Sequence, residues 1–411
     1  MLNTHYDILV VGGGAAGFFT AINAAELCPN LKIAILERGK EVLTKVKISG
    51  GGRCNVTHAE FIPKDLTKNY PRGEKELLGP FHAFMTGDTL AWFEQRGVEI
   101  KMEEDGRMFP ISDSSQTIID CFTSEISRLK IELLTSHPVK SIVKKEECWE
   151  ITTGKDLLTC QSIVMATGSN PKMWNVIESL GHYIIPPVPS LFTFNIKDQR
   201  IVALPGVATE ASIKVVDDKK KVILESEGPL LITHWGMSGP AILKLSAWGA
   251  RSLAPLSYKF EIQVNWLLHD TEEDVIAQLM RLKTKNAKQT LHKYPQFDLP
   301  KRLWQSLLMA SGINEGEIWA DISKKKLQNL ANQMTQSIFQ VDGKSTFKEE
   351  FVTAGGVDLK GVNFKTFESK VHTHLYFAGE VLNIDAITGG FNFQNAWTSG
   401  YIVAKAIADN V

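Results

Sequence analysis

The sequence predicts an α/β protein whose first sheet starts at the N-terminus, is interrupted by a large insertion and is completed at the C-terminus. Three observations lead to this prediction. A glycine-rich turn follows an apolar run at 6–11, a second apolar run at 32–36 is followed by an acidic residue, and a strand-like segment at 375–378 precedes another glycine-rich turn. The chain has 411 residues, which is long enough for two or three domains.

The N-terminal turn has the spacing G-x-G-x-x-G directly after the first apolar run. In such a unit Gly12 permits the tight strand-to-helix turn, Gly14 lets the backbone approach a pyrophosphate, and Gly17 lets the helix pack closely on the sheet. The N-terminus of the following helix attracts phosphate charge. Glu37 stands 20 residues after Gly17, where it would accept a hydrogen bond from a ribose hydroxyl. The pattern predicts a Rossmann-like dinucleotide-binding unit with contacts at Gly12, Gly14, Ala15, Ala16, Gly17, Glu37 and Arg38.

Two later elements indicate which dinucleotide this unit binds. The first comprises Ala166, Thr167 and Gly168, and the second comprises Gly379, Glu380, Asp385, Gly389, Gly390, Phe391, Asn392 and Phe393. FAD binds extended, so its ribityl chain and isoalloxazine need supports that NAD alone does not need. A carboxylate at Glu380 or Asp385 would bind the ribityl hydroxyls. Backbone N–H groups from Gly389 to Phe391, at the start of the last helix, would stabilise negative charge on a reduced flavin.

A second G-x-G-x-x-G after a strand is absent from the sequence. A dedicated NAD(P)H-binding Rossmann domain is therefore not expected. If NAD(P)H reduces the flavin, it would dock transiently in the substrate cleft; otherwise the electrons come from the substrate and leave to oxygen or another acceptor.

The order of predicted elements divides the chain into three parts. An FAD-binding domain is expected at 1–187 and 355–411, an inserted β-rich substrate domain at 188–270 and 337–354, and a helical subdomain at 271–336. A proline-rich segment at 186–189 is expected to form a stiff connector between them. Within these parts the apolar patterns predict helices at 86–96, 115–129 and 394–408, and strands at 139–144, 148–153, 162–168, 259–264, 337–341 and 347–353.

Composition limits the class of partner. The formal charge of −1 gives no electrostatic reason to expect nucleic acid or an anionic membrane as a partner. No apolar stretch is long enough to span a bilayer. The five cysteines include no C-x-x-C pair, which favours a reduced, cytoplasmic setting with no metal site. A small-molecule substrate is expected, and no oligomeric state is predicted.

Five strings of the sequence resemble those of one protein family: VKISGGGRCNVTH, EEDGRMFP, LLITHWGMSGPAIL, VTAGGV and LYFAGEVLNIDAITGGFNFQNAWTSG. They are similar to the BaiN/YhiN-like family of bacterial NAD(P)/FAD-dependent oxidoreductases, also called aminoacetone-oxidase-like flavoproteins. The resemblance extends from about Tyr6 to Ala406 and implies non-covalent FAD in a three-part protein. The sequence departs from the family at Asn383, where Asp is frequent, and at Ser169, where Gly is frequent.

The resemblance also implies a second set of cofactor contacts. The loop from Gly50 to Asn55 would lie against the flavin and its phosphates, and Lys47 or Arg53 would offset diphosphate charge. Val139 would touch the adenine edge through its backbone. These contacts are Lys47, Ser49, Gly50, Gly51, Gly52, Arg53, Cys54, Asn55 and Val139.

The catalytic acid or base is not identified by the sequence. His234 and His58 are weak candidates, because histidine titrates near neutral pH, and a structural role for His234 is about as well supported. Cys54 has no closely spaced second cysteine, so we interpret it as a small residue in a tight loop rather than a redox thiol.

The expected activity is hydride transfer between flavin N5 and a small organic substrate, as an NAD(P)H-linked reduction of an activated C=C or C=O bond. Two alternatives remain open. One is an oxygen-dependent oxidase of a small amine or aminoketone. The other is a non-catalytic flavin-binding or sensor protein whose insertion recognises a partner such as RNA, against which the neutral charge balance argues.

Overall fold

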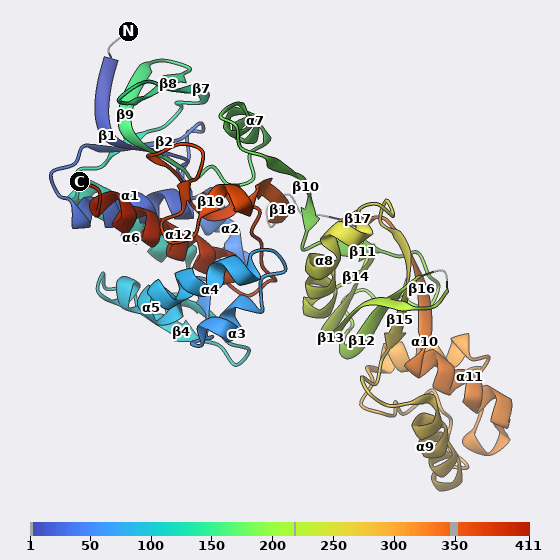
Figure 1. The fold of residues 1–411 in the computed structure, drawn as a ribbon. Coiled ribbons are helices and arrows are strands. Elements are labelled where there is room, and N and C mark those ends of the chain that lie inside the picture. Colours follow the sequence, from blue (N-terminus) through green and yellow to red (C-terminus); the bar gives the residue numbers. More distant parts are fainter. Residues whose placement is uncertain (1–2, 218, 346–351) are drawn as a thin grey trace. The chain divides into compact units, whose positions relative to one another are not determined.

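The computed structural model describes residues 3–217, 219–345 and 352–411. The chain forms two compact units. The first is made of Met1–Pro189 and Lys348–Val411, so it contains both ends of the chain, and the second is Ser190–Phe347. Figure 1 shows the blue N-terminal and red C-terminal segments in the same unit.

The first unit is built on a nine-stranded sheet. Its strands are β1 (Asn3–Val11), β2 (Ile33–Leu36), β6 (Glu132–Leu134), β7 (Val139–Lys144), β8 (Trp149–Thr153), β9 (Leu157–Met165), β19 (Val362–Asn363), β20 (Glu368–Ser369) and β21 (Leu375–Phe377). Strands β6, β2, β1, β9 and β21 are neighbours in that order and run parallel. The predicted α/β fold, with one sheet shared between the two ends of the chain, is confirmed.

The described part of this unit also contains α-helices. They are α1 (Ala15–Leu27), α2 (Thr44–Gly52), α3 (Pro63–Thr67), α4 (Glu74–Ala83), α5 (Thr86–Glu94), α6 (Ser115–Arg128), α7 (Pro171–Ser179) and α12 (Phe391–Ala408). Figure 1 shows α1, α6 and α12 side by side. A Cβ at Gly400 in α12 would lie 3.2 Å from the carbonyl oxygen of Ala16, so a residue without a side chain lets α12 pack closely on α1. Two short 3₁₀ helices, Leu359–Gly361 and Gly379–Val381, complete the helical elements of the unit.

Two small sheets flank the main one. Strands β3 (Thr57–His58), β5 (Arg107–Pro110) and β4 (Ile100–Met102) form one, and β10 (Ile184–Ser190) and β18 (Val352–Val357) form the other. The proline-rich segment expected to be a plain connector is therefore part of a strand. Proline is tolerated there because β10 has only one neighbour and need not donate a hydrogen bond on its other side.

The second unit contains a seven-stranded sheet in the order β16-β15-β12-β13-β14-β11-β17, with every neighbouring pair antiparallel. Its strands are β11 (Thr193–Asn195), β12 (Ala208–Val216), β13 (Val222–Thr233), β14 (Gly236–Ser238), β15 (Lys259–Asn265), β16 (Ser337–Asp342) and β17 (Lys344–Ser345). Its helices are α8 (Pro240–Leu253), α9 (Glu272–Lys285), α10 (Lys301–Ala310), α11 (Lys324–Thr335) and the 3₁₀ helix Trp319–Asp321.

One apolar core joins the sheet and helices of the second unit. Trp266 from the sheet side and Trp304 from α10 both lie in it, each with at most 2% of its surface exposed. The predicted helical segment 271–336 is found as α9, α10 and α11, and the predicted strand at 337–341 as β16. The predicted strand at 347–353 falls largely outside the described residues, and β18 begins at Val352.

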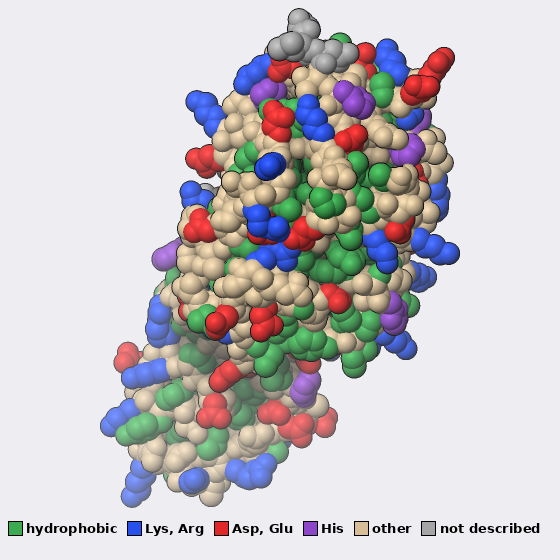
Figure 2. Space-filling model, turned by 90° about the vertical axis from the view of Figure 1, so that its left-hand side faces the viewer, with side chains coloured by type: hydrophobic (Ala, Val, Ile, Leu, Met, Phe, Trp, Pro, Cys, Tyr) green, Lys and Arg blue, Asp and Glu red, His purple; other side chains and the backbone are tan. Residues whose placement is uncertain are grey.

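The surface is mixed in character. Figure 2 shows one face of the protein, on which basic and acidic side chains are spread among hydrophobic ones. No helix in the described part of the chain is long and apolar enough to cross a membrane.

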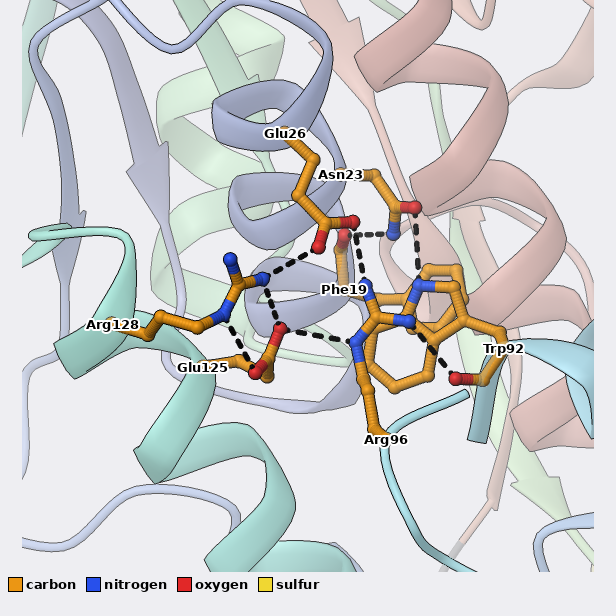
Figure 3. A network of polar contacts seen from close by, with 7 residues as sticks. All are labelled: Phe19, Asn23, Glu26, Trp92, Arg96, Glu125 and Arg128. Atoms are coloured by element: carbon orange, nitrogen blue, oxygen red, sulfur yellow. Dashed lines mark hydrogen bonds and ion pairs between the residues drawn. The ribbon is translucent and has the colours of Figure 1, made fainter. Parts of the chain in front are cut away.

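A polar network joins three helices of the first unit (Figure 3). The guanidinium of Arg96, just after α5, donates to Glu26 of α1 at 2.5 Å and to Glu125 of α6 at 3.1 Å. It also donates to the carbonyl oxygen of Trp92 at 2.9 Å and lies 3.7 Å from that ring. Arg128 binds the same two carboxylates, but its side chain is 54% exposed against 10% for Arg96.

We expect Arg96→Ala to lower the free energy of unfolding by about 2–3 kcal/mol, because it removes the more buried of the two cations that bind these carboxylates. Chemical denaturation measures this loss. Arg128→Ala is the matched control and should cost less than about 1 kcal/mol, because its guanidinium is solvated. Equal losses for the two variants would show that burial does not set the strength of this network.

Candidate functional site

The predicted glycine turn lies between β1 and α1, as its spacing requires. Gly12 has φ of 120°, and a Cβ there would lie 2.3 Å from the carbonyl oxygen of Ala166. A Cβ at Gly17 would lie 2.0 Å from the carbonyl oxygen of Gly12. Both positions therefore exclude any side chain. By contrast, a Cβ at Gly14 would meet nothing within 4 Å. The turn therefore has no room for a side chain at Gly12 or Gly17, whereas it is open at Gly14, the N-cap of α1.

Glu37 directly follows β2 and points back to this turn. Its carboxylate accepts hydrogen bonds from the backbone N–H of Gly13 at 3.0 Å and of Gly39 at 2.7 Å. These two bonds fix the acidic group at the turn and leave further acceptor capacity on both oxygens. The segment just before Val139 lies next to Glu37, because the N–H of His137 donates to the carbonyl oxygen of Glu37 at 2.9 Å. Arg38 is exposed.

Gly379 and Glu380 meet the start of α1 from the C-terminal part of the chain. A Cβ at Gly379, where φ is 71°, would lie 2.9 Å from the Cβ of Ala16. A Cβ at Gly168 would lie 3.7 Å from Oε2 of Glu380, which also accepts from Nζ of Lys45 at 2.6 Å. The structure therefore brings the turn, the end of β9 and the C-terminal element to one place.

Three buried polar atoms near these segments have no hydrogen-bond partner among the described residues: Oγ1 of Thr167, Oε1 of Glu380 and Oδ1 of Asn383. A buried polar atom without a partner is destabilising, by about 1–3 kcal/mol. Ligand hydroxyls would satisfy these atoms. The open side of Gly14 and these three acceptors fit a dinucleotide with a polyol chain, such as FAD.

The loop before α12 is fixed by the loop that follows α2. Gly390 has φ of 94°, and a Cβ there would lie 2.5 Å from the carbonyl oxygen of Thr57. With its amide oriented to satisfy both ends, Asn55 accepts from the N–H of Gly390 at 3.0 Å and donates to the carbonyl oxygen of Thr57 at 3.0 Å. The N–H of Gly390 is thus bound within the protein.

The first turn of α12 contains N–H groups that have no intrahelical partner. Gly390 caps the helix with no side-chain hydrogen bond, as Gly14 does for α1. The N–H groups of Phe391, Asn392 and Phe393 precede the first intrahelical hydrogen bond, so they lack a helical partner. The positive end of the helix dipole adds to their attraction for negative charge.

The structure places the two candidate histidines in different units. His58 lies in β3 of the first unit, with Nδ1 3.1 Å from the carbonyl oxygen of Gly389 and its ring stacked 4.5 Å from that of Phe391. Burial lowers the pKa of His58, although the bond to Gly389 opposes this effect. His234 lies on the exposed turn between β13 and β14 of the second unit. Of the two, His58 is the one that touches the predicted flavin-binding loop.

The segment 47–55 differs in part from the expected loop. Residues from Thr44 are helical as α2, and the helix breaks at Ser49, where ψ is 147°. Gly50 and Gly51 then adopt left-handed conformations with φ of 59° and 70°. Lys47 is exposed on the helical part. Val46, also in the helical part, is buried, which the glycine-rich composition of the segment did not indicate.

Arg53 and Cys54 have local roles. The guanidinium of Arg53 lies 2.6 Å from Glu103 and 3.4 Å from Asp113, and it stacks 3.9 Å from the Phe109 ring. Arg53 is thus held by ion pairs within the protein, and its expected role in offsetting diphosphate charge stays a prediction. Cys54 is buried, and burial raises the pKa of its thiol to about 12. A thiol that stays protonated is a poor nucleophile, which agrees with interpreting Cys54 as a small packing residue.

Asp385 is fully buried and held by an ion pair rather than left open. Its Oδ1 accepts from Nε of Arg72 at 2.5 Å, and Oδ2 accepts from the same guanidinium. This bidentate pair fixes the Asp385 carboxylate within the protein, and its expected contact with the ribityl hydroxyls stays a prediction. Of the two candidates for that role, Glu380 keeps an unpartnered oxygen. The sequence did not indicate Arg72 or Lys45, because neither belongs to a recognisable motif. Arg72 and its partner Asp385 are 313 residues apart.

The comparisons with known proteins agree with this geometry. A family model described as "HI0933-like protein Rossmann domain" matches residues 6–406. The chain belongs to the HI0933-like family. This is the flavoprotein family that the sequence motifs indicated, so the predicted family is confirmed.

Two relatives and one solved structure show the breadth of similarity to this HI0933-like protein. It is 28% identical to the ribosomal RNA dihydrouridine synthase of Haemophilus influenzae, over 99% of this chain and 100% of the relative. It is 26% identical to the 3-dehydro-bile acid delta(4,6)-reductase of Clostridium scindens, over 97% of this chain and 98% of the relative. The structure of a 3-ketosteroid delta1-dehydrogenase from Sterolibacterium denitrificans shares the fold, with a TM-score of 0.53, 11% identity and full coverage of both chains.

We expect Gly14→Ala to weaken FAD binding by the HI0933-like protein at least about tenfold, or about 1.4 kcal/mol. The added methyl group would project into the open side of the turn, where the pyrophosphate is expected. The fold should tolerate it, because Gly14 has φ of −100° and no protein atom lies within 4 Å of its Cβ position. Fluorescence titration of the apoprotein with FAD measures the affinity.

Gly87→Ala is the matched control. Gly87 lies in α5, is exposed, and likewise has nothing within 4 Å of its Cβ position. Alanine should stabilise the helix by up to about 1 kcal/mol and leave FAD affinity unchanged. Unchanged FAD affinity in Gly14→Ala would contradict the placement of the pyrophosphate.

Proposed function

We propose that this chain is an FAD-dependent reductase that adds hydrogen to a C=C bond conjugated to a carbonyl group. The observation that carries the proposal is the set of partnerless polar groups around the start of α1: the open turn at Gly14 and the buried acceptors of Thr167, Glu380 and Asn383. These groups support the binding of a dinucleotide with a polyol chain.

Each segment of the site has a distinct part in holding the cofactor. The N–H groups at the start of α1 would bind the pyrophosphate, and the fixed carboxylate of Glu37 would accept from a ribose hydroxyl. Thr167 and Glu380 would bind the ribityl hydroxyls with their buried, partnerless oxygens. The start of α12 would face the pyrimidine end of the isoalloxazine.

When bound, FAD supplies two-electron chemistry, accepting or donating a hydride equivalent. The protein contributes charge and position. The N–H groups of Phe391, Asn392 and Phe393, which have no intrahelical partner, favour negative charge at the start of α12. His58 supports this loop through Gly389, and burial lowers its pKa, so its ring stays neutral near pH 7 and adds no competing cation.

The relatives support the choice of bond. The names of both the Haemophilus influenzae and the Clostridium scindens relatives describe reduction of a ring C=C bond. In uracil the C5=C6 bond is conjugated to the C4 carbonyl, and in a 3-dehydro-Δ4,6 steroid the double bonds are conjugated to the C3 ketone. A hydride acceptor of this class is common to both. We propose a uracil base in ribosomal RNA as the substrate, because that relative matches 99% of this chain.

The electron donor is proposed to be NAD(P)H, docking transiently. The second unit has an antiparallel sheet over its described strands, which is unlike the parallel sheet of a dinucleotide-binding domain. A separate nicotinamide domain is therefore not expected, and donor and substrate would use the flavin in turn.

An anaerobic experiment tests the proposal. The FAD-loaded protein is titrated with NADPH and then NADH, and flavin bleaching is followed. The reduced protein is mixed with ribosomal RNA from a strain lacking this chain, or with a 3-keto-Δ4,6 steroid. We expect reoxidation of the flavin by RNA and new dihydrouridine by mass spectrometry of the nucleosides. Reoxidation by the steroid alone would retain the reaction class and change the substrate.

The same experiment addresses the two alternatives. Rapid bleaching by small amines or aminoketones, with no bleaching by NADPH or NADH, would replace the reductase with an oxidase. A flavin that stays oxidised with every donor would favour a non-catalytic flavin-binding or sensor protein.

A further inference from the structure

The near-zero charge of the chain conceals a separation between the two units. The unit that contains both chain ends has 25 Lys and Arg against 30 Asp and Glu, a formal charge of −5. The inserted unit has 20 against 16, a formal charge of +4. The expectation that no nucleic acid binds was based on the total of −1. It does not apply to the inserted unit taken by itself.

The excess positive charge is concentrated in one segment. Residues 281–302 contain seven Lys and Arg and one acidic residue, Asp298. Three of the seven bind backbone carbonyls: Lys283 donates to Ile322 at 2.5 Å, Arg302 donates to Ala203 and Pro205, and Nε of Arg281 donates to Ala277 at 3.4 Å. Five of the seven are exposed and form no ion pair with the described residues: Arg281, Lys285, Lys288, Lys293 and Lys301.

Helix stabilisation does not explain this arrangement. Cations favour the C-terminal turn of a helix, which accounts for Lys285 at the end of α9. Lys301 is instead the first residue of α10, where the helix dipole opposes a positive charge. Lys288 and Lys293 lie between the helices. A positively charged surface kept at some cost to the helix indicates an anionic partner.

One of these cations, Arg281, lines a hollow of about 390 Å³. It is lined by Gln278, Arg281 and Leu282 of α9 and by Gln296 and Phe297 of the following loop. Its size lies within the range of about 300–1,000 Å³ that small-ligand sites occupy. The lining combines a guanidinium without a carboxylate partner, two amide side chains and an aromatic ring.

The loop that forms this hollow is held in an uncommon conformation. Phe297 and Asp298 both have left-handed backbone conformations, with φ of 58° and 55°. Nearby in sequence, Tyr294 leaves 49% of its surface exposed, with Nζ of Lys293 5.3 Å from its ring centre. Aromatic rings next to basic side chains are the features with which proteins bind single-stranded nucleic acid.

We propose that this surface binds single-stranded RNA, with one nucleotide in the hollow. The guanidinium of Arg281 binds a phosphate, since its planar donors match two phosphate oxygens. The ring of Phe297 stacks on the base, and the amides of Gln278 and Gln296 bind base edges. Lys288, Lys293 and Lys301 contact the flanking phosphates. This inference rests on the proposed function, since it supposes that the reduced base is carried by RNA.

The spread of charge selects a strand over a free nucleotide. One nucleotide would use Arg281 and the hollow, but it would leave the lysines outside the hollow without a partner. A strand gives each lysine a phosphate, and its release of counterions makes affinity fall steeply with salt.

The test is fluorescence anisotropy of the FAD-loaded protein with a labelled single-stranded RNA of about 16 nucleotides. We expect Arg281→Glu to lower affinity at least about tenfold and to reduce the slope of log affinity against log salt by about 1. The matched control is Lys219→Glu, because Lys219 is exposed in the same unit and lies outside residues 281–302. It should change affinity less than about twofold.

Two further measurements separate this inference from the proposed function. Flavin bleaching by NADPH and reoxidation by a small enone should be the same in Arg281→Glu and wild type. If flavin chemistry fails in both proteins while RNA binding still depends on Arg281, the proposed function is wrong and the RNA surface stands. Equal RNA affinity in the two charge variants would overturn the RNA surface. Saturation of the site by AMP, with no dependence on salt, would overturn it in favour of a free nucleotide.

Discussion

The site depends on close packing at the start of α1, where glycines leave no room for side chains. Gly12 touches the carbonyl of Ala166, Gly17 touches the carbonyl of Gly12, and Gly379 packs on Ala16. Each contact lacks room for a side chain. Glycine at these positions therefore lets the end of β9 and a segment near the C-terminus approach one helix start, although they are far apart in the sequence. The open side of Gly14 is what remains for a ligand.

The parts of the site that local spacing determines could be predicted from the sequence. The distance from Gly17 to Glu37 equals one helix and one strand, so it places the carboxylate at the turn, where it binds Gly13 and Gly39. The predicted strand at 139–144 coincides with β7, and the helix predicted at 115–129 with α6 to within one residue. Such features depend on neighbours a few residues apart, which a single sequence displays.

Partners brought from distant segments could not be predicted. The sequence does not show that Asp385 pairs with Arg72, or that Arg53 pairs with Glu103 and Asp113. The helical start of α2 was not predicted, because it directly precedes a glycine-rich string. Likewise, the net charge of the whole chain does not show the opposite formal charges of its two units, −5 and +4. In each case the sequence does not show which distant residues lie close together in the fold.

The most direct test is a crystal structure of the protein grown with FAD. The account predicts a pyrophosphate within hydrogen-bond distance of the N–H groups at Gly14 and Ala15, and a ribose on Glu37. It also predicts ribityl hydroxyls on the oxygens of Thr167 and Glu380 that now lack partners. A pyrophosphate bound elsewhere, or an FAD complex in which these oxygens stay without partners, would contradict it.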